Sequence, residues 1–265
     1  MKKNILLVFF AFWALLLAAQ KGWDLGVSGT FMNTYIWRQN NYGTLQPFQI
    51  PVVRASEMNY KASWGEQGGF EVGYNFDRQW GIKMGVQYCS TGQDYEDNFE
   101  GPAIIPEGTF GAGGARVNVQ RTIRLGYVMI PIMAKFKTKK ARVAKFFGCL
   151  GPQIGIRTAA YEQVKIAGYV YLPDSLNYPT NEKFQRIDAG VAVQFGVDLY
   201  ATKRLYFEVG LSGYCAFTDL NGQVLQNLGW YDKNHISYQQ SHNTTAGLQI
   251  GIHYVFAKRQ DIWAD

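Results

Sequence analysis

Long apolar runs are scarce in this chain of 265 residues. The run at the N-terminus, Ile5–Leu17, follows two lysines and is shorter than the roughly 18 residues that a membrane-spanning helix needs. Two alanines and Gln20 come next. This order of positive charge, apolar stretch and small residues predicts a cleaved secretory signal peptide over residues 1–19. No later stretch is long enough to cross a bilayer as a helix, which excludes a helical membrane anchor.

Cysteine and charge are also sparse. The three cysteines are odd in number and far apart, so a disulfide framework is not expected. Charged residues make up only 17% of the chain, against 15% aromatic residues and 29 glycines. The net charge of +6 gathers near the expected turns, so we do not expect a nucleic-acid partner.

What the chain does contain is alternation with a period of two. Between Trp80 and Cys89, for example, large apolar residues alternate with glycine, lysine, glutamine and cysteine. Such a pattern is typical of a strand with two different faces. The expected strands begin at Leu25 and cover residues 70–76, 80–89, 122–136, 145–154, 189–200, 205–217 and 242–256.

The connections between these segments alternate in length. Short turns fall at residues 77–79, after 136 and at 201–204, whereas residues 38–67, 91–121, 157–187 and 218–241 form long connections. This asymmetry predicts an all-β, eight-stranded antiparallel up-and-down transmembrane β-barrel with short periplasmic turns and four long extracellular loops. We expect it to occupy residues 20–256 in the outer membrane of a Gram-negative bacterium, followed by a C-terminal tail at 257–265.

Aromatic residues are expected to form a girdle at the periplasmic interface. Ordinary aromatic enrichment in strands is the alternative for any one of them. They lie at strand ends next to the short turns or near the C-terminus: Phe76, Trp80, Phe136, Phe146, Tyr206, Tyr254 and Phe256.

A basic collar is expected around one periplasmic turn. It would attract anionic lipid headgroups or an acidic partner, or it would simply be a solvated edge that opposes aggregation. Its members are Lys137, Lys139, Lys140, Arg142 and Lys145.

Charged residues also fall on positions expected to face the lumen. A barrel of this size is filled by side chains, so these charges should neutralise one another in a buried polar network and leave no channel. The expected network contains Asp24, Glu71, Lys83, Lys135 and Asp198.

Two rival functions follow from the same residues. An outer-membrane lipid-modifying hydrolase would need His253, Glu208 and Ser212 to converge, yet no nucleophile motif supports it, and we predict no enzyme activity. A narrow pore for small solutes would reveal itself by conductance. The three histidines lack metal-ligand spacing, so neither a metal site nor a cofactor is predicted.

Several segments resemble the PorT-like outer-membrane β-barrel family of Bacteroidota. The most specific is Tyr127-Val-Met-Ile-Pro-Ile-Met-Ala-Lys135, which includes Ile130 and Pro131, and it is followed by a Gly-Pro strand that includes Gly151 and Pro152. The resemblance implies a lumen-facing Lys135 and a strand proline at a bulge.

The resemblance also bears on function. It implies a structural or partner-binding role in the cell envelope and a link to the type IX secretion apparatus, in which the family's namesake serves. The expected partners are outer-membrane lipid, lipopolysaccharide, and envelope or secretion proteins.

Overall fold

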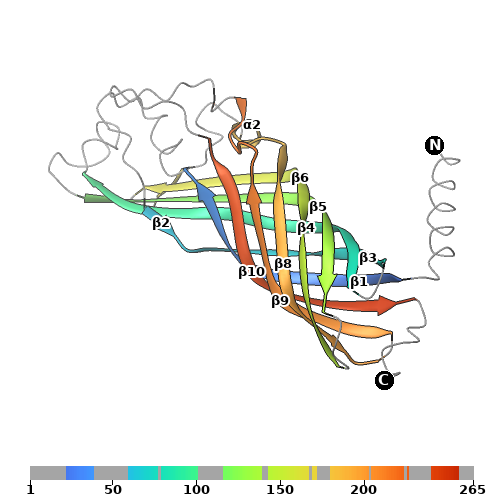
Figure 1. Cartoon of the computed structure of the whole chain (residues 1–265). Helices are drawn as coiled ribbons and strands as arrows, with labels where there is room; N and C mark the ends of the chain where they lie inside the picture. Colours follow the sequence, from blue (N-terminus) through green and yellow to red (C-terminus); the bar gives the residue numbers. More distant parts are fainter. Residues whose placement is uncertain are drawn as a thin grey trace, which may run out of the picture.

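A closed antiparallel β-barrel forms the body of the computed structural model (Figure 1). Its strands are β1 (Trp23–Trp37), β3 (Ser63–Asn75), β4 (Trp80–Glu100), β5 (Arg116–Lys137), β6 (Ala144–Ile166), β8 (Ile187–Tyr200), β9 (Leu205–Ala216) and β10 (His242–Val255). The short elements are β2 (Asn59–Lys61), β7 (Tyr169–Tyr171) and the helix α2 (Thr180–Lys183). The structure describes residues 22–38, 59–76, 79–100, 116–138, 143–166, 169–171, 180–202, 204–223, 226 and 240–256. The expected signal peptide and C-terminal tail lie outside these residues.

The first and last strands close the barrel. β1 pairs with β10 along its whole length, from Asp24 opposite Val255 to Trp37 opposite His242, and each long strand also pairs with the next one along the chain. Closure leaves no free edge in the part of the barrel where these strands are all paired, so their backbone groups there are satisfied without water. The predicted eight-stranded antiparallel barrel is therefore confirmed. No helix within the described ranges is long and apolar enough to cross a membrane.

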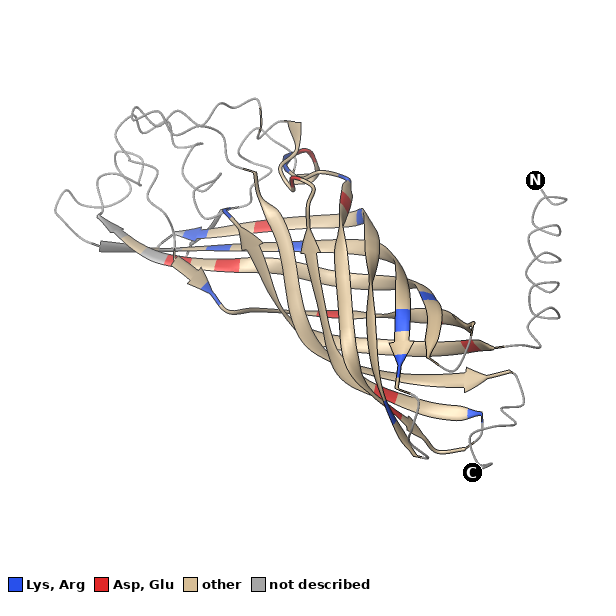
Figure 2. Ribbon diagram, viewed as in Figure 1, with Lys and Arg blue, Asp and Glu red and all other residues tan. Residues whose placement is uncertain are grey.

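Side chains alternate between an apolar exterior and a buried interior. On β4, Trp80 and Tyr88 are each 52% exposed, whereas Lys83 between them is 2% exposed. The same arrangement of apolar side chains outside holds around the barrel, where Phe70 and Ile250 point outward and are 73% and 62% exposed. Most of the ribbon carries no charge (Figure 2). A surface so rich in exposed apolar side chains requires hydrocarbon around it, because each square ångström left in water costs about 25 cal/mol.

The two ends of the barrel differ in their connections. The short turns follow the strands that end at Asn75, Lys137 and Tyr200, and they lie at the end of the barrel where β1 begins and β10 ends. The long connections leave from the opposite end (Figure 1). In outer-membrane barrels short turns face the periplasm, so the long connections lie at the extracellular end.

Three strands continue beyond the rim of the barrel at the extracellular end. β4 and β5 stay paired as far as Glu100 opposite Arg116, and β6 reaches Ile166, although residues 91–121 and 157–187 were expected to be loops. This expectation was wrong because polar strands do not show apolar alternation. Here cross-strand contacts stabilise them instead: the amides of Asn118 and Gln120 donate to Glu96, which also pairs with Lys61 at 2.7 Å.

The protruding part of β4, β5 and β6, together with β2 and β7, is called the extension below. Its inner face buries Tyr95, Ile123, Leu125 and Val164. At its base, on the outside of the barrel, Arg124 donates to Asp94 at 2.8 Å.

The aromatic girdle differs from the prediction at one position. Phe76, Trp80, Phe136 and Phe146 are exposed next to the short turns, as are Tyr254 and Phe256. Tyr206 is 0% exposed and points into the lumen, because it shares a face of β9 with Glu208. Tyr206 is therefore not a girdle residue.

The basic collar also differs from the prediction. Lys137 and Lys145 are only 4% and 5% exposed, so both point into the barrel rather than into the periplasm. Side chains an even number of residues apart on a strand point to the same face. Both lysines have this spacing from an inward-facing residue on their own strand, so they point inward as well. Lys139, Lys140 and Arg142 lie outside the described residues.

Candidate functional site

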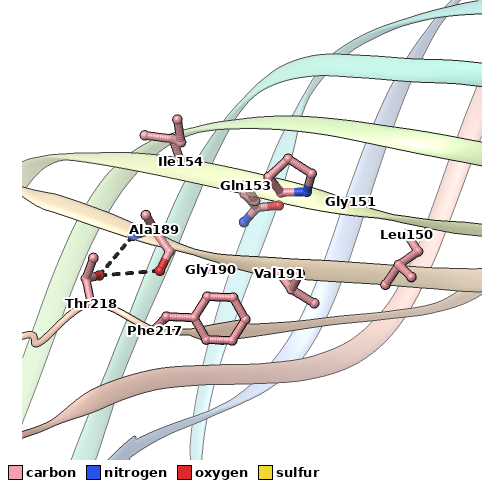
Figure 3. Close-up of a pocket in the computed structure, with 10 residues that line it drawn as sticks. Leu150, Gly151, Gln153, Ile154, Ala189, Gly190, Val191, Phe217 and Thr218 are labelled. Atoms are coloured by element: carbon pink, nitrogen blue, oxygen red, sulfur yellow. Dashed lines mark hydrogen bonds between the residues drawn. The ribbon is translucent and has the colours of Figure 1, made fainter.

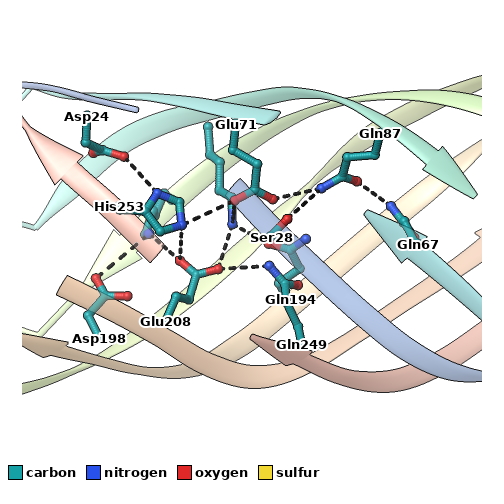
Figure 4. A network of polar contacts seen from close by, with 12 residues as sticks. Asp24, Ser28, Gln67, Glu71, Gln87, Gln194, Asp198, Glu208, Gln249 and His253 are labelled. Carbon is teal, nitrogen blue, oxygen red and sulfur yellow. Dashed lines mark hydrogen bonds and ion pairs between the residues drawn. The ribbon is translucent and has the colours of Figure 1, made fainter. Parts of the chain in front are cut away.

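A connected network of charged side chains fills the periplasmic half of the lumen (Figure 4). It contains all of the residues expected to face inward, each at most 3% exposed: Asp24, Glu71, Lys83, Lys135 and Asp198. Glu208, Lys137 and His253 join it and are equally buried. Because an isolated charge in such a place would cost several kcal/mol, the pairing between these groups decides whether the barrel folds.

Glu208 is the centre of the network. Its two carboxylate oxygens accept hydrogen bonds from Lys83 Nζ at 2.7 Å and Lys135 Nζ at 2.8 Å, and the amide of Gln249 adds a third at 2.9 Å. Glu208 lies opposite Asp198 across β8 and β9, a pairing of like charges that is unfavourable by itself. Lysine ammoniums offset it, because Lys135 lies 3.8 Å and Lys137 2.8 Å from Asp198.

His253 connects two further carboxylates. Its Nδ1 lies 3.4 Å from Asp24 Oδ1, and its Nε2 lies 3.4 Å from Glu71 Oε2 and 3.9 Å from Glu208 Oε2. The ring of Tyr206 stacks on the imidazole at 4.7 Å between ring centroids, and the Tyr206 hydroxyl donates to Asp24 at 3.1 Å. These contacts fix the plane and the position of the imidazole.

Glycine makes room for this histidine. A Cβ at Gly26, which pairs with His253 across β1 and β10, would lie 2.3 Å from His253 Nδ1. A Cβ at Gly73 would lie 2.6 Å from Asp24 Oδ1. Gly26 on β1 and Gly73 on β3 therefore leave the space that His253 and Asp24 occupy.

A second ion cluster lies at the extracellular end. Glu162 on β6 accepts from Arg121 Nε at 2.7 Å and from Lys183 Nζ of α2 at 2.8 Å. The Arg157 guanidinium fastens the same segment by donating to the backbone oxygens of Asn181 and Phe184. α2 is thereby held against β6 at the extracellular end of the barrel.

A segment between β9 and β10 is hydrogen-bonded to α2 and to the residues that follow α2. Gly222 N donates to Lys183 O, and Gln185 N donates to Leu220 O, both at 2.8 Å. At the opposite end Tyr200, Tyr206 and Val255 pack together. The described side chains thus pack together inside the barrel near both of its ends.

The hydrolase triad is only partly assembled. His253 and Glu208 approach to 3.9 Å, but Ser212 lies four residues farther along β9, roughly 13 Å away at about 3.3 Å per residue. Within the described ranges no hydrogen bond links Ser212 to His253.

The histidines do not meet. His242 Nδ1 contacts Thr218 O at the extracellular end, His253 lies in the lumen network, and His235 lies outside the described residues. What does come together is Glu71, Glu208 and His253, whose potential ligand atoms all lie within 4.8 Å of one another. Sequence spacing could not reveal this group, because its members come from three different strands.

Some residues of the motif Tyr127–Lys135 face the lumen, and others face the outside of the barrel. The Tyr127 hydroxyl accepts from Asn243 Nδ2 at 3.3 Å inside the barrel, whereas Ile130 faces outward. Pro131 points inward, and the register shift expected at this proline lies instead between Gly126 and Tyr127. A bulge at Pro131 itself is therefore not found.

An apolar groove lies on the outer wall between β6 and β8, with a volume of about 670 Å³ (Figure 3). Pro152, Ala189 and Val191 line it, and Leu150, Ile154 and Phe217 are the larger exposed side chains around them. The groove opens onto the apolar exterior rather than into the lumen.

Solved outer-membrane structures of low sequence identity match this chain over most of its length. Neisserial surface protein A has 11% identity and a TM-score of 0.40, over 89% of this chain and 98% of that one. The outer membrane protein OprG of Pseudomonas aeruginosa has 11% identity and a TM-score of 0.38, over 89% and 97%. The outer membrane protease OmpT of Escherichia coli has 8% identity and a TM-score of 0.35, over 89% and 97%.

Family membership comes from the sequence itself. No curated protein matches this chain. The model of the outer membrane protein beta-barrel domain family, however, matches residues 19–222, which is most of the chain. With its closed barrel and apolar exterior, this protein belongs to the outer membrane protein beta-barrel domain family and resides in the outer membrane.

Proposed function

We propose that this protein is a structural, partner-binding barrel of the cell envelope, and neither a pore nor an enzyme. The observation that carries this proposal is the combination of a lumen filled with paired charged side chains and an extension that continues beyond the barrel. A lumen packed with paired charges has no path for a solute. The extension, in contrast, offers a rigid surface to other molecules.

The outer face of the extension suits a polar partner. Lys61, Glu96, Asn118 and Gln120 form a hydrogen-bonded surface there, held by backbone pairing on both sides of β4 and β5. Backbone pairing keeps such a surface ordered, which lowers the entropy lost when a protein or glycan binds.

Affinity purification from native outer membranes tests this role. The variant to compare lacks residues 95–121, with a two-residue turn joining Asp94 to Thr122, which already face each other. We expect the intact chain to retain a partner that the shortened barrel loses. Identical sets of copurified proteins from the two chains would contradict the proposal.

The identity of that partner is part of the proposal. The motif Tyr127–Lys135 and the Gly151-Pro152 pair support membership of the PorT-like subgroup and an association with the type IX secretion apparatus. Copurification of secretion components supports this association, whereas a barrel that brings down only lipopolysaccharide favours a general surface role.

Lipid is the second proposed partner. The groove at Pro152, Ala189 and Val191 is lined almost entirely by apolar atoms and opens where hydrocarbon surrounds the barrel. We expect an acyl chain of an outer-membrane lipid to occupy it.

A further inference from the structure

His253 is buried in the lumen network with neither of its ring nitrogens hydrogen-bonded to a described residue. Other network atoms without a hydrogen bond, such as Glu71 Oε2 and Asp198 Oδ2, have a lysine ammonium within 2.9 Å. His253 is 1% exposed, and its Nε2 points at the carboxylates of Glu71 and Glu208. Buried polar atoms without hydrogen bonds are rare and call for an explanation, such as an ion held between them.

The spacing of these atoms fits a metal better than a hydrogen bond. His253 Nε2 and Glu71 Oε2 are 3.4 Å apart, beyond the usual 2.7–3.2 Å of a hydrogen bond. Two ligands of a tetrahedral zinc ion, each bound at about 2.0–2.1 Å, lie roughly 3.3 Å apart. Glu208 Oε2 lies 3.9 Å from the same nitrogen, so it would need to move roughly 0.6 Å closer, and the three ligand atoms, now within 4.8 Å of one another, would have to draw together around the ion.

The surroundings of His253 have the form of a metal site. Its other nitrogen, Nδ1, faces Asp24 at 3.4 Å, and Asp24 is in turn held by the Tyr206 hydroxyl at 3.1 Å and by the Asn75 amide at 3.0 Å. Metal-bound histidines commonly have a carboxylate at the second ring nitrogen, which sets the tautomer and increases ligand basicity.

We propose that Glu71, Glu208 and His253 form a binding site for a divalent transition metal of the zinc type, with Asp24 as the residue that orients the histidine. One imidazole and two carboxylates suit Zn²⁺ or Co²⁺, whereas Ca²⁺ and Mg²⁺ prefer sets made only of oxygen ligands. This site is independent of the proposed partner-binding role.

Two lysines compete for this site. The Lys135 ammonium lies 2.8 Å from Glu208 Oε2. The Lys83 ammonium lies 2.9 Å from Glu71 Oε2 and 2.7 Å from Glu208 Oε1, so it neutralises both carboxylates that a metal would need. Lys83 also donates to Gln194 Oε1 at 3.0 Å. Metal binding therefore displaces ammoniums from the carboxylates, and removing the Lys83 ammonium should strengthen it.

The test uses the full chain without a histidine tag, folded in detergent, with Co²⁺ as the probe. We expect Lys83→Met to bind one equivalent with the intense visible bands of a four-coordinate site, and to bind at least about tenfold more tightly than the wild type. The matched control is Lys137→Met, which removes an ammonium from the same network at Asp198, away from the three ligands. This control should bind Co²⁺ as the wild type does.

Adding His253→Gln to Lys83→Met should abolish the bands. Lys83→Met without stoichiometric Co²⁺, or bands that persist in the double variant, would overturn the proposal. Retention of the heat-sensitive mobility of folded barrels on gels shows which variants are folded. If Lys83→Met does not fold, the wild-type chain in excess Zn²⁺ provides the test: its unfolding midpoint should rise, and it should not rise in His253→Gln.

Discussion

At the scale of single residues, the interior of this barrel depends on a few carboxylates that each neutralise more than one cation. Glu208 is the extreme case, because Lys83 and Lys135 both donate to it within 2.8 Å while Asp198 lies opposite on β8. Neutralising Glu208 would leave two buried ammoniums with weaker compensation. The arrangement is therefore more sensitive to loss of one partner than to loss of a whole pair.

We expect Glu208→Gln to lower the free energy of unfolding by about 3–5 kcal/mol, measured by urea titration in detergent micelles. Gln keeps the size of the side chain, so the loss reports charge rather than packing. The control is Glu96→Gln, which removes a partly exposed carboxylate paired with Lys61 outside the lumen and should leave the midpoint nearly unchanged. Equal midpoints for Glu208→Gln and the wild type would show that the lumen charges do not stabilise the fold.

The space around His253 allows a second prediction at this scale. Gly26→Ala places a methyl group against the imidazole, which Tyr206 blocks from moving on one face, so we expect a loss of about 1–3 kcal/mol. Gly29→Ala, on the same strand, meets no atom closer than 3.9 Å and should be tolerated. The same urea titration compares them, and equal losses would indicate a general cost of replacing glycine in β1.

At the scale of strands and loops, the outer wall is uneven between β6 and β8. Proline and alanine there leave a groove bordered by Leu150, Ile154 and Phe217. We expect Ala189→Trp to fill it and reduce the lipid that copurifies, measured by native mass spectrometry. Val193→Trp is the matched control, since Val193 is exposed on the same strand but does not line the groove. Unchanged lipid in Ala189→Trp would show that the groove holds no particular chain.

The strands could be predicted only where they cross the membrane. Alternation places Trp80 and Ile82 in lipid and Lys83 in the lumen, so the crossing segments follow from the sequence. The extension was missed because residues such as Asn118 and Gln120 pair through polar contacts and show no apolar period. Tyr206 and Lys137 were misplaced for another reason: near a turn, a residue type suited to the interface also suits a packed polar lumen.

The lumen site was only partly predictable. Each of Asp24, Glu71, Lys83, Lys135 and Asp198 sits on a face that the alternation identifies as inward. Their partners could not be assigned, because the contact between Glu208 and Lys83 depends on strand tilt and stagger across the barrel. For the same reason, the sequence could not show that Glu71 and His253 lie close together.

At the scale of the whole molecule, two surfaces with opposite requirements are built from alternate residues of the same strands. The exterior needs hydrocarbon, the interior needs paired charges, and closure of β1 on β10 separates them. Among the described residues, Lys183 of α2 is held by Glu162 at one end, and Tyr200 and Tyr206 pack together at the other.

Planar-bilayer conductance tests this account most directly. The folded chain, inserted in a bilayer and bathed in concentrated KCl, should give no stepwise ionic current, because Glu208, Lys83, Lys135 and Asp198 fill the lumen. Insertion is verified by protease protection of the strands in the same preparation. Reproducible single-channel steps from the intact chain would contradict the account, since they would require an open lumen that this packing excludes.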